Sequence, residues 1–130
     1  MKWKKLVLAV LVLLLGVLTL SAQGKAPYPA YCTITVGRSS MSSYQVTVQI
    51  DYGQYANPSS DDREIVDETG YAIRFNSLAE AANYLSKLGW KFEYVYTTQR
   101  DNRSREHWVL SKMVTDDSQI AQGIRTHRYY

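Results

Sequence analysis

Alternating apolar and polar positions predict two neighbouring strands early in the chain. Over residues 31–37, Cys32 and the apolar residues that follow it alternate with threonines, and a Ser-rich turn covers residues 38–43. Residues 44–52 carry the cleanest alternation in the chain. We expect their apolar face to be buried, because the opposite polar row would cost free energy to bury without partners. The two strands should form an antiparallel hairpin. The apolar face of the second strand consists of Tyr44, Val46, Val48, Ile50 and Tyr52.

A loop, two short strands and one helix are predicted in the middle of the chain. Residues 53–62 have the composition of a loop, and the short strands near 64–67 and 71–75 are joined by a tight turn. Ser77, with Glu80 three positions later, forms a capping box that begins a helix. Gly89 ends this helix at Leu88, since glycine adopts the left-handed conformation of a C-terminal cap. Its apolar stripe consists of Leu78, Ala81, Ala82, Leu85 and Leu88.

An aromatic hairpin is predicted after the helix. Residues 90–97 alternate as a half-buried strand, a charged turn covers residues 99–105, and residues 106–113 close the sheet. A short helix can begin near Asp116 and run through Ile124, followed by a frayed tail. The aromatic face of the first strand consists of Trp90, Phe92, Tyr94 and Tyr96.

These elements predict an α+β fold with the order β-β-β-β-α-β-β. Residues 31–114 form one domain, an antiparallel sheet of four to six strands with one amphipathic helix on one face, and residues 115–130 form a C-terminal tail. A single helix is about 10 Å wide and strands lie about 4.8 Å apart, so the helix covers roughly two strands. We expect the remaining aromatic strip to be covered by the C-terminal segment, a second subunit or a ligand.

The N-terminal segment reads as an export signal. Residues 1–22 combine a lysine-rich start, a 15-residue apolar run and a small-residue exit, which are the parts of a secretory signal peptide. Residues 23–30, with two prolines, form a linker. We therefore predict a secreted or periplasmic protein that meets the membrane only through this leader before cleavage. The alternative is a membrane anchor through residues 6–20.

Removal of the leader changes the charge. The chain has 15 Lys and Arg against 12 Asp and Glu, but three of the lysines lie in the first five residues. The mature domain is then neutral, with 12 residues of each sign. A neutral domain gains little from the release of phosphate counterions, so we expect no nucleic-acid partner.

The end of the predicted helix carries a resemblance. Ala82, Leu85, Gly89 and Trp90 stand in an Ala-x-x-Leu-x-x-x-Gly-Trp pattern ahead of two strands. This pattern resembles small bacterial domains of unknown function in which a helix ends in Leu-x-x-Leu-x-x-x-Gly-Trp between antiparallel strands. The resemblance covers residues 64–113 and implies a fold without an activity. The leader, ending in Ser-Ala-Gln, also resembles those of short exported proteins of Gram-negative anaerobes.

Candidate chemistry is sparse. The only histidines, His107 and His127, lie 20 residues apart, and the spacings typical of zinc sites are missing from the sequence, so we predict no metal and no cofactor. We expect His107 on a strand and His127 in solvent. The lone Cys32 is interpreted as a buried strand residue, with a free thiol for intermolecular pairing as the alternative. A hydrolytic enzyme would require Cys32, His107 and a carboxylate to converge.

Tyrosine and arginine dominate the candidate binding residues. Tyrosine suits a contact surface because it joins an apolar ring to a polar tip. The leading hypothesis is an exported, non-catalytic module that binds another protein or associates with itself. A carbohydrate or small-ligand domain with an aromatic platform is the alternative. The candidate residues are Tyr52, Tyr94, Tyr96 and Trp108 for the platform, and Arg100, Arg103 and Arg105 for the hairpin.

Overall fold

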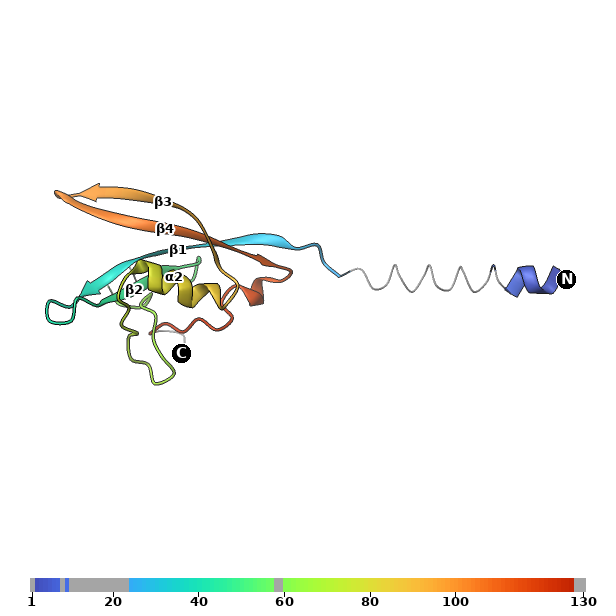
Figure 1. Cartoon of the computed structure of the whole chain (residues 1–130), viewed down its shortest axis with the longest axis horizontal. Coiled ribbons are helices and arrows are strands. Elements are labelled where there is room, and N and C mark those ends of the chain that lie inside the picture. The colour runs from blue at the N-terminus through green and yellow to red at the C-terminus, as the bar shows by residue number, and fades with distance from the viewer. Residues whose placement is uncertain (1, 8, 10–23, 58–59, 128–130) are drawn as a thin grey trace.

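The domain is built on a four-stranded antiparallel sheet with the strand order β2-β1-β4-β3. The structure is a computed structural model, and it describes residues 2–7, 9, 24–57 and 60–127. Figure 1 shows the β3–β4 hairpin along one side of the molecule, with helix α2 and the C-terminal segment on the other side of β1. The elements are β1 (Tyr28–Ser39), β2 (Val46–Asp51), α2 (Leu78–Ser86), β3 (Lys91–Arg100), β4 (Arg103–Val114) and the 3₁₀ turn η1 (Asp117–Gln119).

The core lies between one face of the sheet and α2, which confirms the α+β prediction. Cys32 and Ile34 of β1, Val48 and Ile50 of β2 and Leu110 of β4 all point toward the helix and are buried. The predicted apolar stripe faces this core, and its members Ala82 and Leu88 are half-buried. Its buried members are Leu78, Ala81 and Leu85.

The ends of α2 follow from the predicted caps. The Ser77 hydroxyl accepts a hydrogen bond from the Glu80 amide, and the Glu80 carboxylate reaches back to the Asn76 amide. At the other end Gly89 has φ +95°, and the Trp90 amide donates to the Leu85 carbonyl. A positive φ of this kind favours glycine. The helix itself ends at Ser86, two residues before the predicted Leu88, and residues 87–89 form a turn that Gly89 closes.

The hairpin of β3 and β4 turns through two residues with left-handed backbone. Asp101 has φ 51° and Asn102 has φ 60°, as a type I′ turn requires. A β-bulge interrupts the ladder between Phe92 and Tyr94. Phe92 pairs with the core residue Leu110, whereas Tyr94 pairs with Val109, whose side chain points to the opposite face of the sheet. The predicted single aromatic face is therefore wrong: Trp90 and Phe92 face the helix, and the two tyrosines that follow face the opposite side.

β3 also differs from its predicted half-buried state. Every residue of Lys91–Arg100 is exposed, and within the described part of the chain β3 pairs with β4 alone. The helix is too narrow to cover this strand.

Other differences concern element ends. β1 begins at Tyr28, so it includes residues assigned to the linker, because Tyr28 pairs with Val114 of β4. Tyr44 is exposed in the turn before β2, with φ 56°, rather than in the core. The segments predicted as strands at 64–67 and 71–75 form isolated bridges rather than named strands. The expected C-terminal helix is limited to the three residues of η1.

The predicted leader lies mostly outside the described residues, although residues 2–7 and 9 are helical. None of the helices in the described segments has the length and apolar character needed to cross a bilayer.

Candidate binding surface

One surface of the sheet lies opposite α2, and we call it the outer face. Strand register places Asp51, Thr33, Val109 and Tyr94 directly beside one another across all four strands of this face. Neighbouring strands lie about 4.8 Å apart, so this row is about 14 Å long from Asp51 to Tyr94. Its two middle members, Thr33 and Val109, have short side chains and Tyr94 at one end is much larger, so the sheet surface is low at the centre of the row.

An open groove of about 650 Å³ occupies this low part of the sheet surface. Tyrosine rings and a carboxylate border it, while Thr33 and Val109 lie at its centre. Aromatic rings together with one carboxylate form an amphipathic surface suited to binding a ligand that is neither wholly apolar nor strongly anionic. The lining residues are Tyr31, Cys32, Thr33, Asp51, Tyr52, Gly53, Tyr94, Tyr96 and Val109.

Tyr96 is held in place by its cross-strand neighbour. The rings of Tyr96 and His107 stack with centroids 4.7 Å apart and an angle of 8°. His107 Nε2 lies 2.9 Å from the Thr98 hydroxyl. Burial and the nearby Arg105 charge lower the pKa of His107 below its usual value. The ring is thus neutral at pH 7, and it orients Tyr96 without adding charge to the outer face.

Three arginines share this face with the tyrosines. Arg100 pairs with Arg103 across the hairpin, and Arg105 pairs with Thr98. Because side chains alternate along a strand, these arginines point to the same side as Tyr94 and Tyr96. The acidic residues that alternate with them in sequence are directed elsewhere: Asp101 lies in the turn, and Glu106 lies on the helix side.

Glu106 is engaged on that helix side, where its carboxylate accepts a hydrogen bond from the Trp108 indole. Folding therefore separates charges that the sequence interleaves. The outer face of the hairpin tip is cationic even though the segment as a whole is nearly balanced.

The structure brings most, but not all, of the predicted site together. Tyr52, Tyr94 and Tyr96 line the groove, and the three arginines continue the same face toward the tip. Trp108 does not belong to it: this ring is half-buried on the helix side, 5.2 Å from Phe92 in an edge-to-face contact. Its predicted place in the aromatic platform is wrong, because its position in β4 has the parity of Leu110.

Cys32 and His107, the pair considered for a hydrolytic site, do not converge. Cys32 faces the core and is 2% exposed, whereas His107 lies on the outer face. Burial raises the pKa of the Cys32 thiol to about 12, so the side chain is a protonated core residue at neutral pH. Among the described residues, no group of three His, Cys, Asp or Glu side chains is arranged to hold a metal ion.

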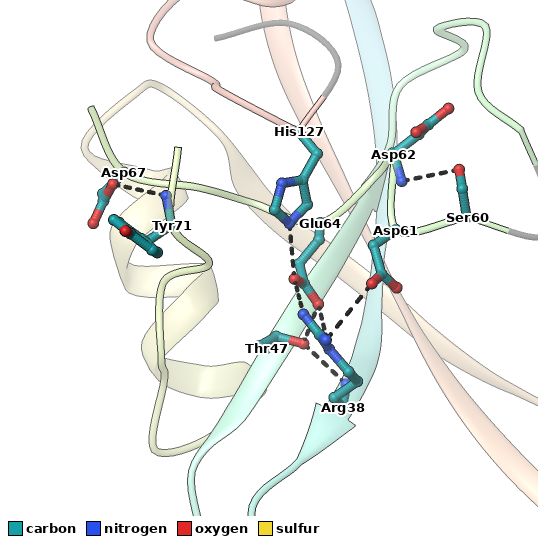
Figure 2. A network of polar contacts seen from close by, with 9 residues as sticks. All are labelled: Arg38, Thr47, Ser60, Asp61, Asp62, Glu64, Asp67, Tyr71 and His127. Atoms are coloured by element: carbon teal, nitrogen blue, oxygen red, sulfur yellow. Dashed lines mark hydrogen bonds and ion pairs between the residues drawn. The ribbon is translucent and has the colours of Figure 1, made fainter. Parts of the chain in front are cut away.

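A polar cluster centred on Glu64 lies beside β2, on the side of the sheet away from the hairpin. Bridges join Gln49 to Glu64 and Ile65 to Thr126, so the C-terminal segment lies beside the 64–66 segment. Figure 2 shows Glu64 at the centre of this cluster, with the guanidinium of Arg38 on one side and the His127 ring on another. The prediction of a solvated His127 in a frayed tail is wrong, since its Nε2 lies 3.1 Å from Glu64 Oε1.

Glu64 is fully buried and receives several hydrogen bonds. Arg38 Nη2 donates to Oε1 at 2.6 Å and its Nε donates to Oε2 at 3.2 Å. The Thr47 hydroxyl donates to Oε2 at 2.6 Å. Burial by itself raises the pKa of Glu64, but these bonds and that from His127 outweigh it, and the pKa is lowered from 4.5. The cluster fastens β1, β2, the 64–66 segment and the C-terminal segment to one another.

Sequence reasoning missed Tyr31, Asp51 and His107 on the outer face, and Glu64 altogether. A signal for Tyr31 exists, because it alternates with Cys32 and Ile34 and must point away from a core that holds them. The partners of Glu64 are 17, 26 and 63 residues away, so no local pattern marks it. In comparisons with family models, curated proteins and solved structures, nothing matches this chain.

Proposed function

We propose that this protein is an exported, non-catalytic interaction module that binds a protein partner through the outer face of the β3–β4 hairpin. The supporting observation is that three arginines share one face with two exposed tyrosines. Tyr94 is 57% exposed and Tyr96 is 42% exposed. Tyrosine and arginine are the side chains that most often dominate binding energy at protein interfaces.

The arrangement favours a partner with a particular chemistry. Arg100, Arg103 and Arg105 present guanidinium groups that can pair with carboxylates, in the bidentate geometry typical of arginine. The tyrosine rings beside them fit an apolar or aromatic neighbour. The partner should therefore carry acidic residues next to an apolar patch, and the interaction should weaken as salt is raised.

A capture experiment with matched variants tests the proposal. The full chain is immobilised and exposed to envelope proteins of its source, in parallel with Arg100→Glu, Tyr96→Ser and the control Arg74→Glu. Arg74 is exposed in the 71–75 segment, away from the hairpin, so its reversal changes net charge equally. A genuine partner should be retained by the control and reduced at least about tenfold, or 1.4 kcal/mol, by either hairpin variant. Equal retention by all four proteins would exclude the outer face as the binding surface.

The groove supports a second candidate function, binding of a neutral saccharide. Sugar rings stack on aromatic faces, and the Asp51 carboxylate at the end of the groove can accept hydrogen bonds from hydroxyl groups. Asp51 already accepts the Gly53 amide and lies 3.7 Å from Arg63, which holds the carboxylate at the groove edge. Calorimetric titration with neutral oligosaccharides should give heat that Tyr94→Ser removes; a signal that survives this substitution would place the sugar elsewhere.

The proposal retains two finer expectations. Export would require cleavage of the 1–22 leader, which N-terminal sequencing of the natural protein tests directly. The predicted order of elements along the chain, β-β-β-β-α-β-β, would require the 64–67 and 71–75 segments to act as strands. The bridges from Gln49 to Glu64 and from Val46 to Phe75 support this order, since they continue the ladder next to β2.

A further inference from the structure

The free edge of β3 is unusually unprotected for a sheet edge. Residues 94–99 read Tyr-Val-Tyr-Thr-Thr-Gln, a run without charge or proline and rich in β-branched and aromatic residues. Natural edge strands are normally blocked by a lysine, a proline, a bulge or a covering segment, because a bare edge pairs with other strands. In β3 the bulge and the charged Lys91 and Glu93 come before this run, and Arg100 comes after it.

Register shows which backbone groups the edge offers. In a two-residue hairpin the residues that flank the turn, Arg100 and Arg103, form a closely hydrogen-bonded pair. Because such pairs alternate with non-bonded pairs along an antiparallel ladder, the amides and carbonyls of every second residue point away from β4. Counting from Arg100, the outward-facing residues between the turn and the bulge are Val95, Thr97 and Gln99.

We propose that the occupant of this edge is the β3 strand of a second copy of the chain, joined antiparallel about a two-fold axis at Thr97. In this register Val95 of one copy faces Gln99 of the other, and Thr97 faces Thr97. It is the register in which all three outward positions of each copy meet outward positions of its partner. The product is a continuous eight-stranded sheet.

The side chains agree with this register. On the outer face, Arg100 lies directly opposite the second copy's Tyr94, where a guanidinium can stack on the ring. Glu93, in the bulge, also points to the outer face, because its carboxylate accepts a hydrogen bond from the Ser111 hydroxyl. In the proposed register Glu93 lies next to the second copy's Arg100. Arg100 of the two copies stand at opposite ends of the paired segment, so their charges do not oppose each other.

The two-fold axis runs through the sheet from face to face, so both outer faces remain on the same side. The inference goes beyond the proposed function: it concerns the edge of the hairpin rather than its outer face. Dimerisation would bring the outer faces of the two copies side by side, with Arg100 and Tyr94 meeting where the strands join, and substitutions at Thr97 leave both of these residues in place. A partner-binding defect and a pairing defect are thus separable.

Cysteine crosslinking of the full chain tests the register. A hydrogen-bonded antiparallel pair has Cα atoms about 5.5 Å apart, within the range that a disulfide spans. Under mild oxidation Thr97→Cys should give a covalent dimer by itself. Val95→Cys and Gln99→Cys should each stay largely monomeric alone, because each is four positions from its own symmetry mate, yet should crosslink when mixed. A size tag on one of them identifies the mixed dimer.

Each outcome is decisive. Association through another part of the chain would leave Thr97→Cys no more readily crosslinked than the other two variants, and that result would overturn the inference. Absence of a Thr97→Cys dimer, in a protein whose tryptophan emission and circular dichroism match those of the unmodified chain, would overturn it as well. Thr97→Pro offers a second measurement: it removes an outward amide without breaking the β4 ladder, and sedimentation should show at least tenfold weaker association.

Discussion

Replacement of Arg38 by methionine should expose how the buried Glu64 is stabilised. The substitution keeps an apolar stem of similar length but removes both guanidinium hydrogen bonds, at 2.6 and 3.2 Å. Glu64 has no exposed surface, while the Arg38 side chain is 54% exposed and partly screened by water. Hydrogen bonds to a charged group contribute about 1.5–3 kcal/mol each, so allowing for screening we expect a loss of about 2–3 kcal/mol.

The pH dependence identifies the cause. In the unmodified protein the pKa of Glu64 is lowered from 4.5, so the carboxylate stabilises the fold above that value, and this contribution is lost as pH falls through the folded pKa. Without Arg38, only the hydrogen bonds from Thr47 and His127 oppose the effect of burial, so we expect the pKa of Glu64 to be higher than in the unmodified protein. The ionised carboxylate should then stabilise the variant less than the unmodified protein. The difference between the two proteins therefore grows from pH 4 to pH 7.

Urea denaturation at pH 4.0, 5.5 and 7.0, followed by tryptophan emission, measures this difference. Trp90 is 2% exposed and reports on the core. A loss of 2–3 kcal/mol corresponds to a midpoint lower by about 1–2 M urea for a domain of this size. Glu64→Gln provides the background for a double-mutant cycle, in which Arg38→Met should cost much less. A penalty that is the same at all three pH values, or undiminished beside Glu64→Gln, would refute the reasoning.

Three further predictions concern single positions. Cys32, with a pKa raised to about 12 by burial, should react with a disulfide reagent at pH 8 at least about a hundredfold more slowly in the native chain than in urea. Equal rates would place the thiol outside the core. Gly37→Ala should cost about 1–3 kcal/mol, because the added Cβ would lie 2.8 Å from the Thr47 hydroxyl; Gly24→Ala, with nothing within 4 Å, is the neutral control in the same urea titration. Ser77→Ala should cost about 1 kcal/mol by removing the helix cap, and an unchanged midpoint would show that the cap is not needed.

The sequence predicted those parts of the fold that depend on short-range patterns. Ser77, Glu80 and Gly89 set the helix ends through contacts within a few residues, and the alternation of β1 and β2 identified the core side of both strands. The Glu64 cluster could not be predicted in this way. The cluster forms only when Glu64 meets three residues that are distant in sequence: Arg38, Thr47 and His127. In the sequence alone, a single glutamate after a loop is typical of a solvated residue.

The candidate surface was predicted in composition but not in arrangement. In the sequence, Arg100, Arg103 and Arg105 are interleaved with Asp101 and Glu106, so the segment as a whole carries little net charge. Only the two-residue turn at Asp101 and Asn102 fixes the parity that puts the three arginines on one face. A turn one residue longer or shorter would mix the charges.

The bulge near Glu93 reconciles two registers that the hairpin must satisfy together. Near the helix, Phe92 must pair with Leu110, because both side chains belong on the core side. Near the tip, the left-handed turn at Asp101–Asn102 requires Arg100 to pair with Arg103. These two pairings differ by one residue, so one strand must contain an extra residue between them. Glu93 is that residue, and its consequence is that Tyr94 and Tyr96 leave the core side and join the arginines on the outer face. The proposed binding surface thus follows from a conflict between core packing and turn chemistry, which the alternation of residues 90–97 conceals.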